Sequence, residues 1–239
     1  MPAFKWEEQK TPRYRYLIYG VPGVGKTTLS ASLPGKTYML SLDGSFTRIK
    51  AYQGNQDIWL IDPETPIEDL NRFVVWFNHN AKTYDNLVID NLSNLQKLWF
   101  VEKAKESKTG LDNQLAHYNE YSNWAIRLFS KLLSYDVNIL FTAWEARRPI
   151  TDANGQQFEQ YGPDVRDQVR DYVMGNCDVV GRLISKEDGT RGVILTGDVG
   201  TYAKNRLDDR RGCVANELFT LRLPAETGRP SQAEPSDGQ

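Results

Sequence analysis

The chain has 239 residues, of which 40% are hydrophobic and 25% charged, so it can bury the core of one ordinary α/β domain. A formal net charge of −2 excludes nucleic-acid binding through overall charge and leaves only local basic patches for such contacts. No apolar run approaches the roughly 20 residues that span a bilayer. Residues 1–10 lack an apolar signal core, and Cys177 and Cys213 have no metal-ligand spacing. These features predict a cytoplasmic protein without a membrane partner.

Short apolar runs that alternate with helical patterns predict an α/β fold with a mostly parallel central sheet, buried on both faces. The runs of strand character are residues 14–20, 37–43, 57–62, 86–92 and 137–144. Residues 66–80 and 118–133 have helical spacing, and Pro66 suits a first helical turn. We therefore expect helices to flank the sheet.

The pattern changes after residue 144. Asn154-Gly155 predicts a hairpin turn, and the runs 177–184 and 192–197 predict antiparallel strands added late to the sheet. Pro, Ser, Gly and charged residues fill the end of the chain. The predicted organisation is an N-terminal arm (1–13), one domain (14–223) and a disordered tail (224–239).

Residues 20–27 read GVPGVGKT and fit the G-x-x-x-x-G-K-[ST] pattern of a phosphate-binding loop, or P-loop. Its glycines let successive backbone N–H groups face phosphate oxygens. Lys26 would reach the β- and γ-phosphates and act in catalysis, and the Thr27 hydroxyl would bind Mg²⁺. The predicted nucleotide-binding residues are Gly20, Val21, Pro22, Gly23, Val24, Gly25, Lys26, Thr27 and Thr28.

Two aspartates at strand ends are candidates for holding the metal and orienting water. Asp90 ends an apolar run that we expect beside the strand leading into the P-loop, and it would bind Mg²⁺ together with Thr27. Hydrolysis also needs a group that orients water, and Asn91 cannot act as a base. Asp43 is the candidate catalytic carboxylate. The alternative is that both aspartates only form strand-end turns.

Six segments resemble, in this order, those of the phage nucleotide-binding ATPase family: LIYGVPGVGKTTL, YMLSLDG, NLVIDNLSNL, FTAWEAR, CDVVGRL and AKNRLDDRRG. That family is RecA-like and includes phage single-strand-annealing recombinases, and the resemblance covers roughly residues 14 to 212. It implies a RecA-like ATPase of the host cytoplasm that assembles into a ring or filament and hydrolyses ATP under stimulation by single-stranded DNA. RecA has Glu where this chain has Asp43, so hydrolysis would be slow.

The resemblance implies roles for later residues as well. RecA-like enzymes carry a polar sensor of the γ-phosphate one strand after the metal aspartate, and Thr142 and Glu145 both fit, the latter as a catalytic residue. Lys204 and Arg206 lie in a segment similar to the Lys-Asn-Arg motif of RadA-type relatives. There, a cation from one subunit reaches the nucleotide of its neighbour. A solvated basic turn is the alternative.

Two segments match the DNA-binding loops of RecA-like folds. The residues concerned are Lys103, Lys105 and Lys108 in the first segment and Arg147, Arg148, Phe158 and Tyr161 in the second. Cations follow the backbone of a single strand while aromatic rings stack on its bases. The alternatives are a solvated helix for the first segment and rings packed into the hairpin for the second. Single-stranded DNA is therefore the expected partner, and a single-strand-binding protein is a further candidate.

Other functions use the same P-loop. A small-molecule phosphotransferase, such as a nucleotide kinase, needs an arginine-rich lid, and residues 146–170 contain four arginines. An ATP-gated DNA-binding module with negligible turnover is compatible with Asn91 and with Asp43 in place of Glu. A GTPase is excluded, because the sequence after Asp90 is Asn-Leu-Ser instead of the Asp-x-x-Gly that a GTPase needs.

Overall fold

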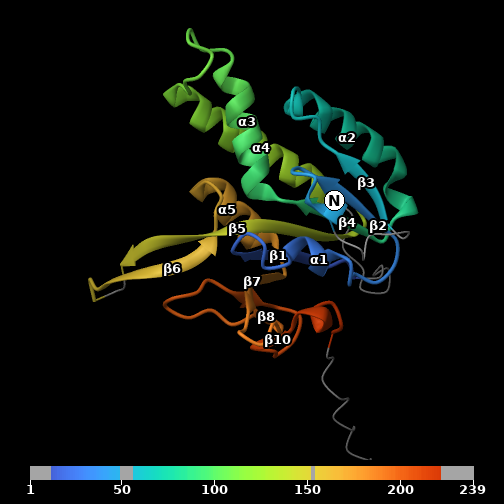
Figure 1. Cartoon of the computed structure of the whole chain (residues 1–239), viewed down its shortest axis with the longest axis vertical. Coiled ribbons are helices and arrows are strands. Elements are labelled where there is room, and N and C mark those ends of the chain that lie inside the picture. The colour runs from blue at the N-terminus through green and yellow to red at the C-terminus, as the bar shows by residue number, and fades with distance from the viewer. Residues whose placement is uncertain (1–11, 49–55, 152–153, 222–239) are drawn as a thin grey trace, which may run out of the picture.

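The computed structural model describes residues 12–48, 56–151 and 154–221. Its strands form a sheet in the order β10-β8-β7-β1-β5-β4-β2-β3, with β6 paired to β5 and β9 paired to β7 (Figure 1). The strands are β1 (Arg15–Gly20), β2 (Thr37–Ser41), β3 (Gln56–Leu60), β4 (Asn86–Asp90), β5 (Asn138–Thr151), β6 (Gln157–Pro163), β7 (Val179–Ser185), β8 (Arg191–Ile194), β9 (Lys204–Asn205) and β10 (Gly212–Val214). The expected tail and residues 1–11 of the expected arm lie outside the described residues.

The centre of the sheet is parallel, which confirms the predicted fold class. β1 pairs in parallel with β5 and β7, β4 with β5 and β2, and β2 with β3. All residues of β2 and β4 are buried, as expected for strands covered on both faces. The prediction for 177–184 was wrong in one respect: β7 is parallel to β1, and the antiparallel addition begins with β8.

Helices cover both faces of this sheet. They are α1 (Lys26–Ser30), α2 (Pro66–Asn80), α3 (Leu92–Ala104), α4 (Leu115–Leu133) and α5 (Asp167–Asn176). Figure 1 shows α2, α3, α4 and α5 on one face, whereas α1 lies on the other with β8 and β10 nearby. The helix expected at 66–80 has those bounds, with Pro66 in its first turn. No helix among the described residues is long and apolar enough to cross a membrane.

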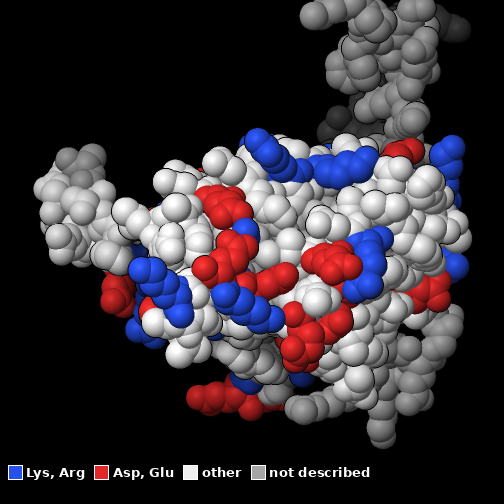
Figure 2. Space-filling model, turned by 90° about the horizontal axis from the view of Figure 1, so that it is seen from above, with Lys and Arg blue, Asp and Glu red and all other residues white. Residues whose placement is uncertain are grey.

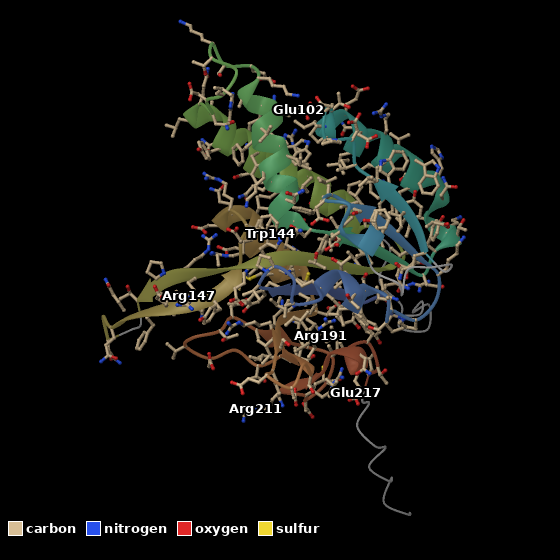
Figure 3. The ribbon with its side chains drawn as sticks, in the orientation of Figure 1. Glu102, Trp144, Arg147, Arg191, Arg211 and Glu217 are labelled. Atoms are coloured by element: carbon tan, nitrogen blue, oxygen red, sulfur yellow. The ribbon has the colours of Figure 1, made fainter. Side chains whose placement is uncertain are left out.

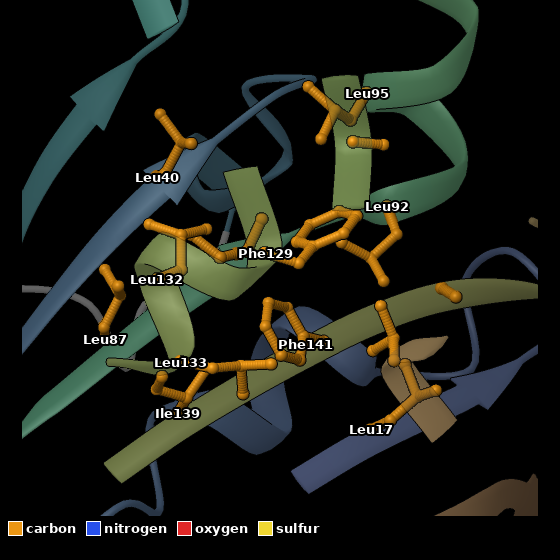
Figure 4. Packing of buried hydrophobic residues seen from close by; sticks show 14 of the residues in the cluster. Leu17, Leu40, Leu87, Leu92, Leu95, Phe129, Leu132, Leu133, Ile139 and Phe141 are labelled. Atoms are coloured by element: carbon orange, nitrogen blue, oxygen red, sulfur yellow. The ribbon is translucent and has the colours of Figure 1, made fainter. Parts of the chain in front are cut away.

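The larger hydrophobic core lies between the sheet and the helices α2 to α5. Phe129 of α4 packs edge-on against Phe141 of β5 at a centroid distance of 5.6 Å (Figure 4). Leu17 and Leu132 lie in the same cluster and are almost fully buried. Each such side chain stabilises the fold by about 1.5–3 kcal/mol. This core fixes the strands whose ends carry the site.

β5 continues well beyond the expected strand 137–144. Its first half is buried, and its second half pairs antiparallel with β6 and projects from the sheet as a hairpin (Figure 1). Gly155, with φ +80°, lies in the predicted turn; residues 152–153 lie outside the described ranges. One strand therefore runs from the sheet interior, past the edge where the P-loop lies, into the hairpin.

Candidate functional site

The P-loop follows the carboxyl end of β1 and leads into α1. A Cβ on Gly20 would lie 2.5 Å from the carbonyl oxygen of Leu183, so only glycine fits there. Gly25 has φ +104°, a left-handed conformation that strains any other residue. Glycine at these two positions therefore allows the loop to pass closely over the ends of the strands.

The Lys26 side chain is held inside the P-loop and is only 5% exposed. Its Nζ donates to the carbonyl oxygens of Gly20 and Val21 at 2.8 and 2.9 Å. Burial lowers the pKa of Lys26 to about 8, and the negative charges of Asp90, Glu145 and Asp43 oppose this shift. The loop therefore holds a cation close to three carboxylates.

Asp90 is the centre of a buried polar cluster. Its Oδ2 accepts a hydrogen bond from the Thr27 hydroxyl at 2.7 Å, and its Oδ1 accepts one from the Thr142 hydroxyl. The Ser45 hydroxyl lies 3.1 Å from Thr27 Oγ1 and 3.4 Å from Asp90 Oδ2. Burial raises the pKa of Asp90, whereas the bonds from Thr142 and Thr27 lower it.

The oxygens of this cluster fit a magnesium ion. Mg²⁺ binds to proteins through one or two carboxylates and hydroxyls and completes its octahedron with phosphate and water. Thr27, Ser45 and Asp90 supply that donor set at one point beside the P-loop. In the described ranges no group of three or more His, Cys, Asp or Glu residues could hold a metal ion.

The prediction that Asp90 lies on the strand next to β1 was wrong. β5 lies between β1 and β4, and the residue that fills the gap is Thr142, which pairs with Ile18 and is fully buried. Its hydroxyl contacts the Asp90 carboxylate directly. Of the two candidate sensors, Thr142 is therefore the one that lies in the Asp90 cluster.

Asp43 is exposed just beyond β2, the neighbour of β4. Its Oδ2 accepts a hydrogen bond from Asn91 Nδ2 at 3.2 Å, and its Oδ1 accepts one from the Ser45 backbone at 2.9 Å. Asn91 also caps α3 by accepting from the Asn94 amide at 2.8 Å. Asn91, which cannot act as a base itself, thus orients the carboxylate of Asp43, which can.

Glu145 belongs to a second polar cluster, which joins the sheet edge to the hairpin. Its carboxylate forms a bidentate ion pair with Arg182, at 2.8 and 3.2 Å. The Arg182 guanidinium lies 3.5 Å from the ring centroid of Tyr161, and that of Arg147 lies 4.9 Å from it. The Tyr161 carbonyl accepts from the Tyr19 hydroxyl, one residue before the P-loop, at 3.0 Å.

The other hairpin residues differ in their ion pairs and in their exposure to solvent. Arg148 forms an ion pair with Asp167 and anchors the hairpin to α5. Arg147 is 60% exposed and lies 3.7 Å from Glu159. Phe158 is half-buried. Arg147 with Tyr161 is therefore the cation–aromatic pair that this segment leaves near solvent.

The first predicted DNA segment leaves the helix early, because α3 ends at Ala104 and the residues that follow form turns. Lys103 lies within α3 and contacts Glu106 and Glu120 at 2.9 and 2.8 Å. Lys105 donates to a backbone carbonyl just before α2, and Lys108 is exposed. Figure 2 shows basic and acidic side chains interleaved on the face seen from above. The three lysines are not brought together as one basic patch.

The Lys204 ammonium caps the carboxyl end of α5, donating to the carbonyls of Met174 and Gly175 at 2.6 and 3.3 Å. Burial lowers the pKa of Lys204. Arg206 is exposed. β9 pairs with Val179–Val180, at the start of β7, which runs parallel to β1. Both cations therefore lie at the amino ends of these strands, whereas the P-loop follows the carboxyl end of β1.

Sequence reasoning missed Ser45, the positioning role of Asn91 and Arg182. Ser45 and Asn91 follow the two predicted aspartates within two residues, and polar residues after strand ends are the signal that could have found them. Arg182 had no such signal, because its partner is 37 residues away in the chain.

Comparison with known proteins adds one match. Residues 12–207, most of the chain, match a family model described as AAA domain. No curated protein matches the chain.

Proposed function

The chain belongs to the AAA domain family, a family of P-loop ATPases, and we propose that it is a RecA-like, ATP-dependent recombinase that binds and anneals single-stranded DNA in phage recombination. Nucleotide binding and hydrolysis are the activities that such a domain suggests. The observation that carries the proposal is the polar cluster of Thr27, Thr142 and Asp90 between the P-loop and β4. It lies at the same sheet edge from which the β5–β6 hairpin projects.

Each side chain of the site has a distinct task in the proposed hydrolysis. Lys26 and the loop amides bind the phosphates, and Asp43 orients the attacking water. Thr27 and Asp90 would hold Mg²⁺, which neutralises phosphate charge when bound. Thr142 keeps the Asp90 carboxylate aligned from the intervening strand.

The proposed coupling to DNA is supported by the length of β5. The same strand carries Thr142 beside Asp90, Glu145 beside Arg182, and Arg147 on the hairpin. Tyr161 contacts both guanidiniums. A ring next to cations is the arrangement that binds bases and phosphates of a single strand without sequence preference.

Self-assembly is the third part of the proposal. Arg206 is exposed at the end of the sheet opposite its own P-loop, and this position supports a role at the nucleotide of a neighbouring subunit. The capping bonds of Lys204 favour Arg206 as the finger. The expected assembly is a homo-oligomer in the host cytoplasm.

ATP turnover with and without single-stranded DNA tests this function. We expect DNA to stimulate the wild type, and Lys26→Ala, Asp43→Asn and Arg206→Ala each to abolish the stimulation. Asp209→Asn and Arg211→Ala, at exposed residues outside the site, are the matched controls. Undiminished DNA-stimulated turnover in Arg206→Ala would refute the trans finger. A wild type that neither binds nor responds to DNA would refute the recombinase.

An ATP-gated DNA-binding module is the second candidate, because both oxygens of Asp43 already accept hydrogen bonds. It predicts ATP-dependent DNA binding, negligible turnover and no effect of Asp43→Asn. A phosphotransferase lid is disfavoured, since Arg148 and Arg170 both pair with Asp167. Phosphate transfer to an added nucleoside monophosphate would support that enzyme instead.

A further inference from the structure

Arg191, which begins β8, lies directly against the P-loop. A Cβ placed on Gly25 would lie 2.5 Å from its Nη1 and 2.7 Å from its Cζ, so the guanidinium covers this glycine. Figure 3 labels Arg191 between α1 and the C-terminal strands. The residue is exposed, and within the described part of the chain its side chain has neither a hydrogen bond nor an ion pair. The guanidinium is therefore available to a ligand.

Arg191 also lines a hollow of about 360 Å³ beside α1. Thr28 and Leu29 of α1 form one side of it, and Val214 and Asn216 form the other. Ligand pockets typically combine apolar walls with a few polar groups in this way. Because Gly25 belongs to the P-loop and Thr28 directly follows it, the hollow continues directly from the phosphate site.

The sheet order determines which end of a nucleotide faces this hollow. β8 and β10 lie on one side of β1, whereas β4 and β2, which lead to Asp90 and Asp43, lie on the other. The Thr27 hydroxyl contacts Asp90, whereas Thr28 lines the hollow. The metal and the γ-phosphate belong with Asp90, so the nucleoside has to leave the loop on the side of β8.

We propose that Arg191 and this hollow bind the nucleoside end of ATP, with the guanidinium stacked on the base and Leu29 and Val214 in contact with its apolar surface. The inference rests on the proposed binding of ATP by the P-loop. A guanidinium is planar and weakly hydrated, so it stacks on flat rings. The Asn216 amide supplies a hydrogen-bonding partner for the base or the ribose. Arg191 is then a specificity-determining residue outside the phosphate-binding motif.

Binding of Mg·ATP and of Mg·tripolyphosphate to the full chain, measured by calorimetry, separates the two ends of the ligand. Arg191→Ala should weaken ATP and ADP about tenfold and leave tripolyphosphate, which has no nucleoside, unchanged. Asn216→Trp, which fills the hollow from an exposed position, should have the same selective effect. Arg211→Ala is the matched control and should change neither affinity.

Two results would overturn the inference. Equal weakening of ATP and tripolyphosphate by Arg191→Ala would make Arg191 a phosphate contact, and so would full recovery of ATP affinity in Arg191→Lys, because lysine supplies charge without a stacking plane. Failure of the proposed function looks different: the wild type would then bind neither ligand. Lys26→Ala marks that outcome, since it should lose both.

Discussion

Replacing Lys26 by Met measures what it costs the fold to keep a buried cation in the P-loop. The side chain is 5% exposed, and burial lowers its pKa from 10.5 to about 8. The unfolded chain therefore binds more protons than the folded chain between pH 8 and pH 10.5. Wild-type stability should rise with pH through that window, because protons bound only by the unfolded state favour unfolding.

The size of the effect follows from the shift. At about 1.4 kcal/mol per pKa unit, the charged ammonium costs the folded state about 3 kcal/mol at pH 7 and about 1 kcal/mol at pH 10. Met has similar length and no charge. Lys26→Met also loses the bonds to the Gly20 and Val21 carbonyls, and any change of those bonds with pH is already contained in the pKa shift. The stability of the variant relative to wild type should thus fall by about 2 kcal/mol from pH 7 to pH 10.

Urea unfolding followed by tryptophan fluorescence, in EDTA and without nucleotide, gives the two free energies at pH 7, 8.5 and 10. Lys108→Met, at an exposed lysine, is the matched control. A difference between Lys26→Met and wild type that stays constant over this range would refute the reasoning. It would mean that burial does not penalise the charge.

Three further substitutions test neighbouring parts of the site. Thr142→Val removes one hydrogen bond from the Asp90 carboxylate and should raise the Mg²⁺ concentration needed for half-maximal turnover about tenfold; an unchanged Mg²⁺ titration would contradict this. Asp43→Glu restores the longer carboxylate and should raise turnover at unchanged ATP affinity, whereas slower turnover would show that the carboxylate position is already optimal. Lys204→Met should lower the free energy of unfolding by about 1 kcal/mol without changing turnover, because it removes the cap of α5. If Lys204→Met instead lost turnover at unchanged stability, Lys204 would be supported as the trans finger.

Local signals in the sequence predicted the P-loop and several neighbouring elements of the fold. Pro66 and helical spacing predicted α2, and the P-loop motif placed Lys26 and Thr27 after a buried strand. These features depend on residues close together in the chain, where propensity and spacing act directly. The same holds for the hairpin at Asn154-Gly155.

Strand order could not be predicted from such signals. Uniformly apolar strands fit any position in the centre of a parallel sheet, so nothing in β4 showed that β5 separates it from β1. The same limit hid the contacts of Thr142 with Asp90, of Glu145 with Arg182 and of Lys204 with α5. Each joins residues at least 29 positions apart, and only the folded chain brings them together.

The position of Arg206, opposite the P-loop of its own chain, has a consequence for the kinetics of an assembly. If each active site uses Arg206 of the next subunit, the number of complete sites equals the number of interfaces between subunits and not the number of chains. A closed ring has as many interfaces as chains, so every P-loop is served. An open filament always has one fewer, and one terminal chain stays idle. Turnover per chain should therefore climb with filament length toward a plateau, but be independent of concentration once rings have closed.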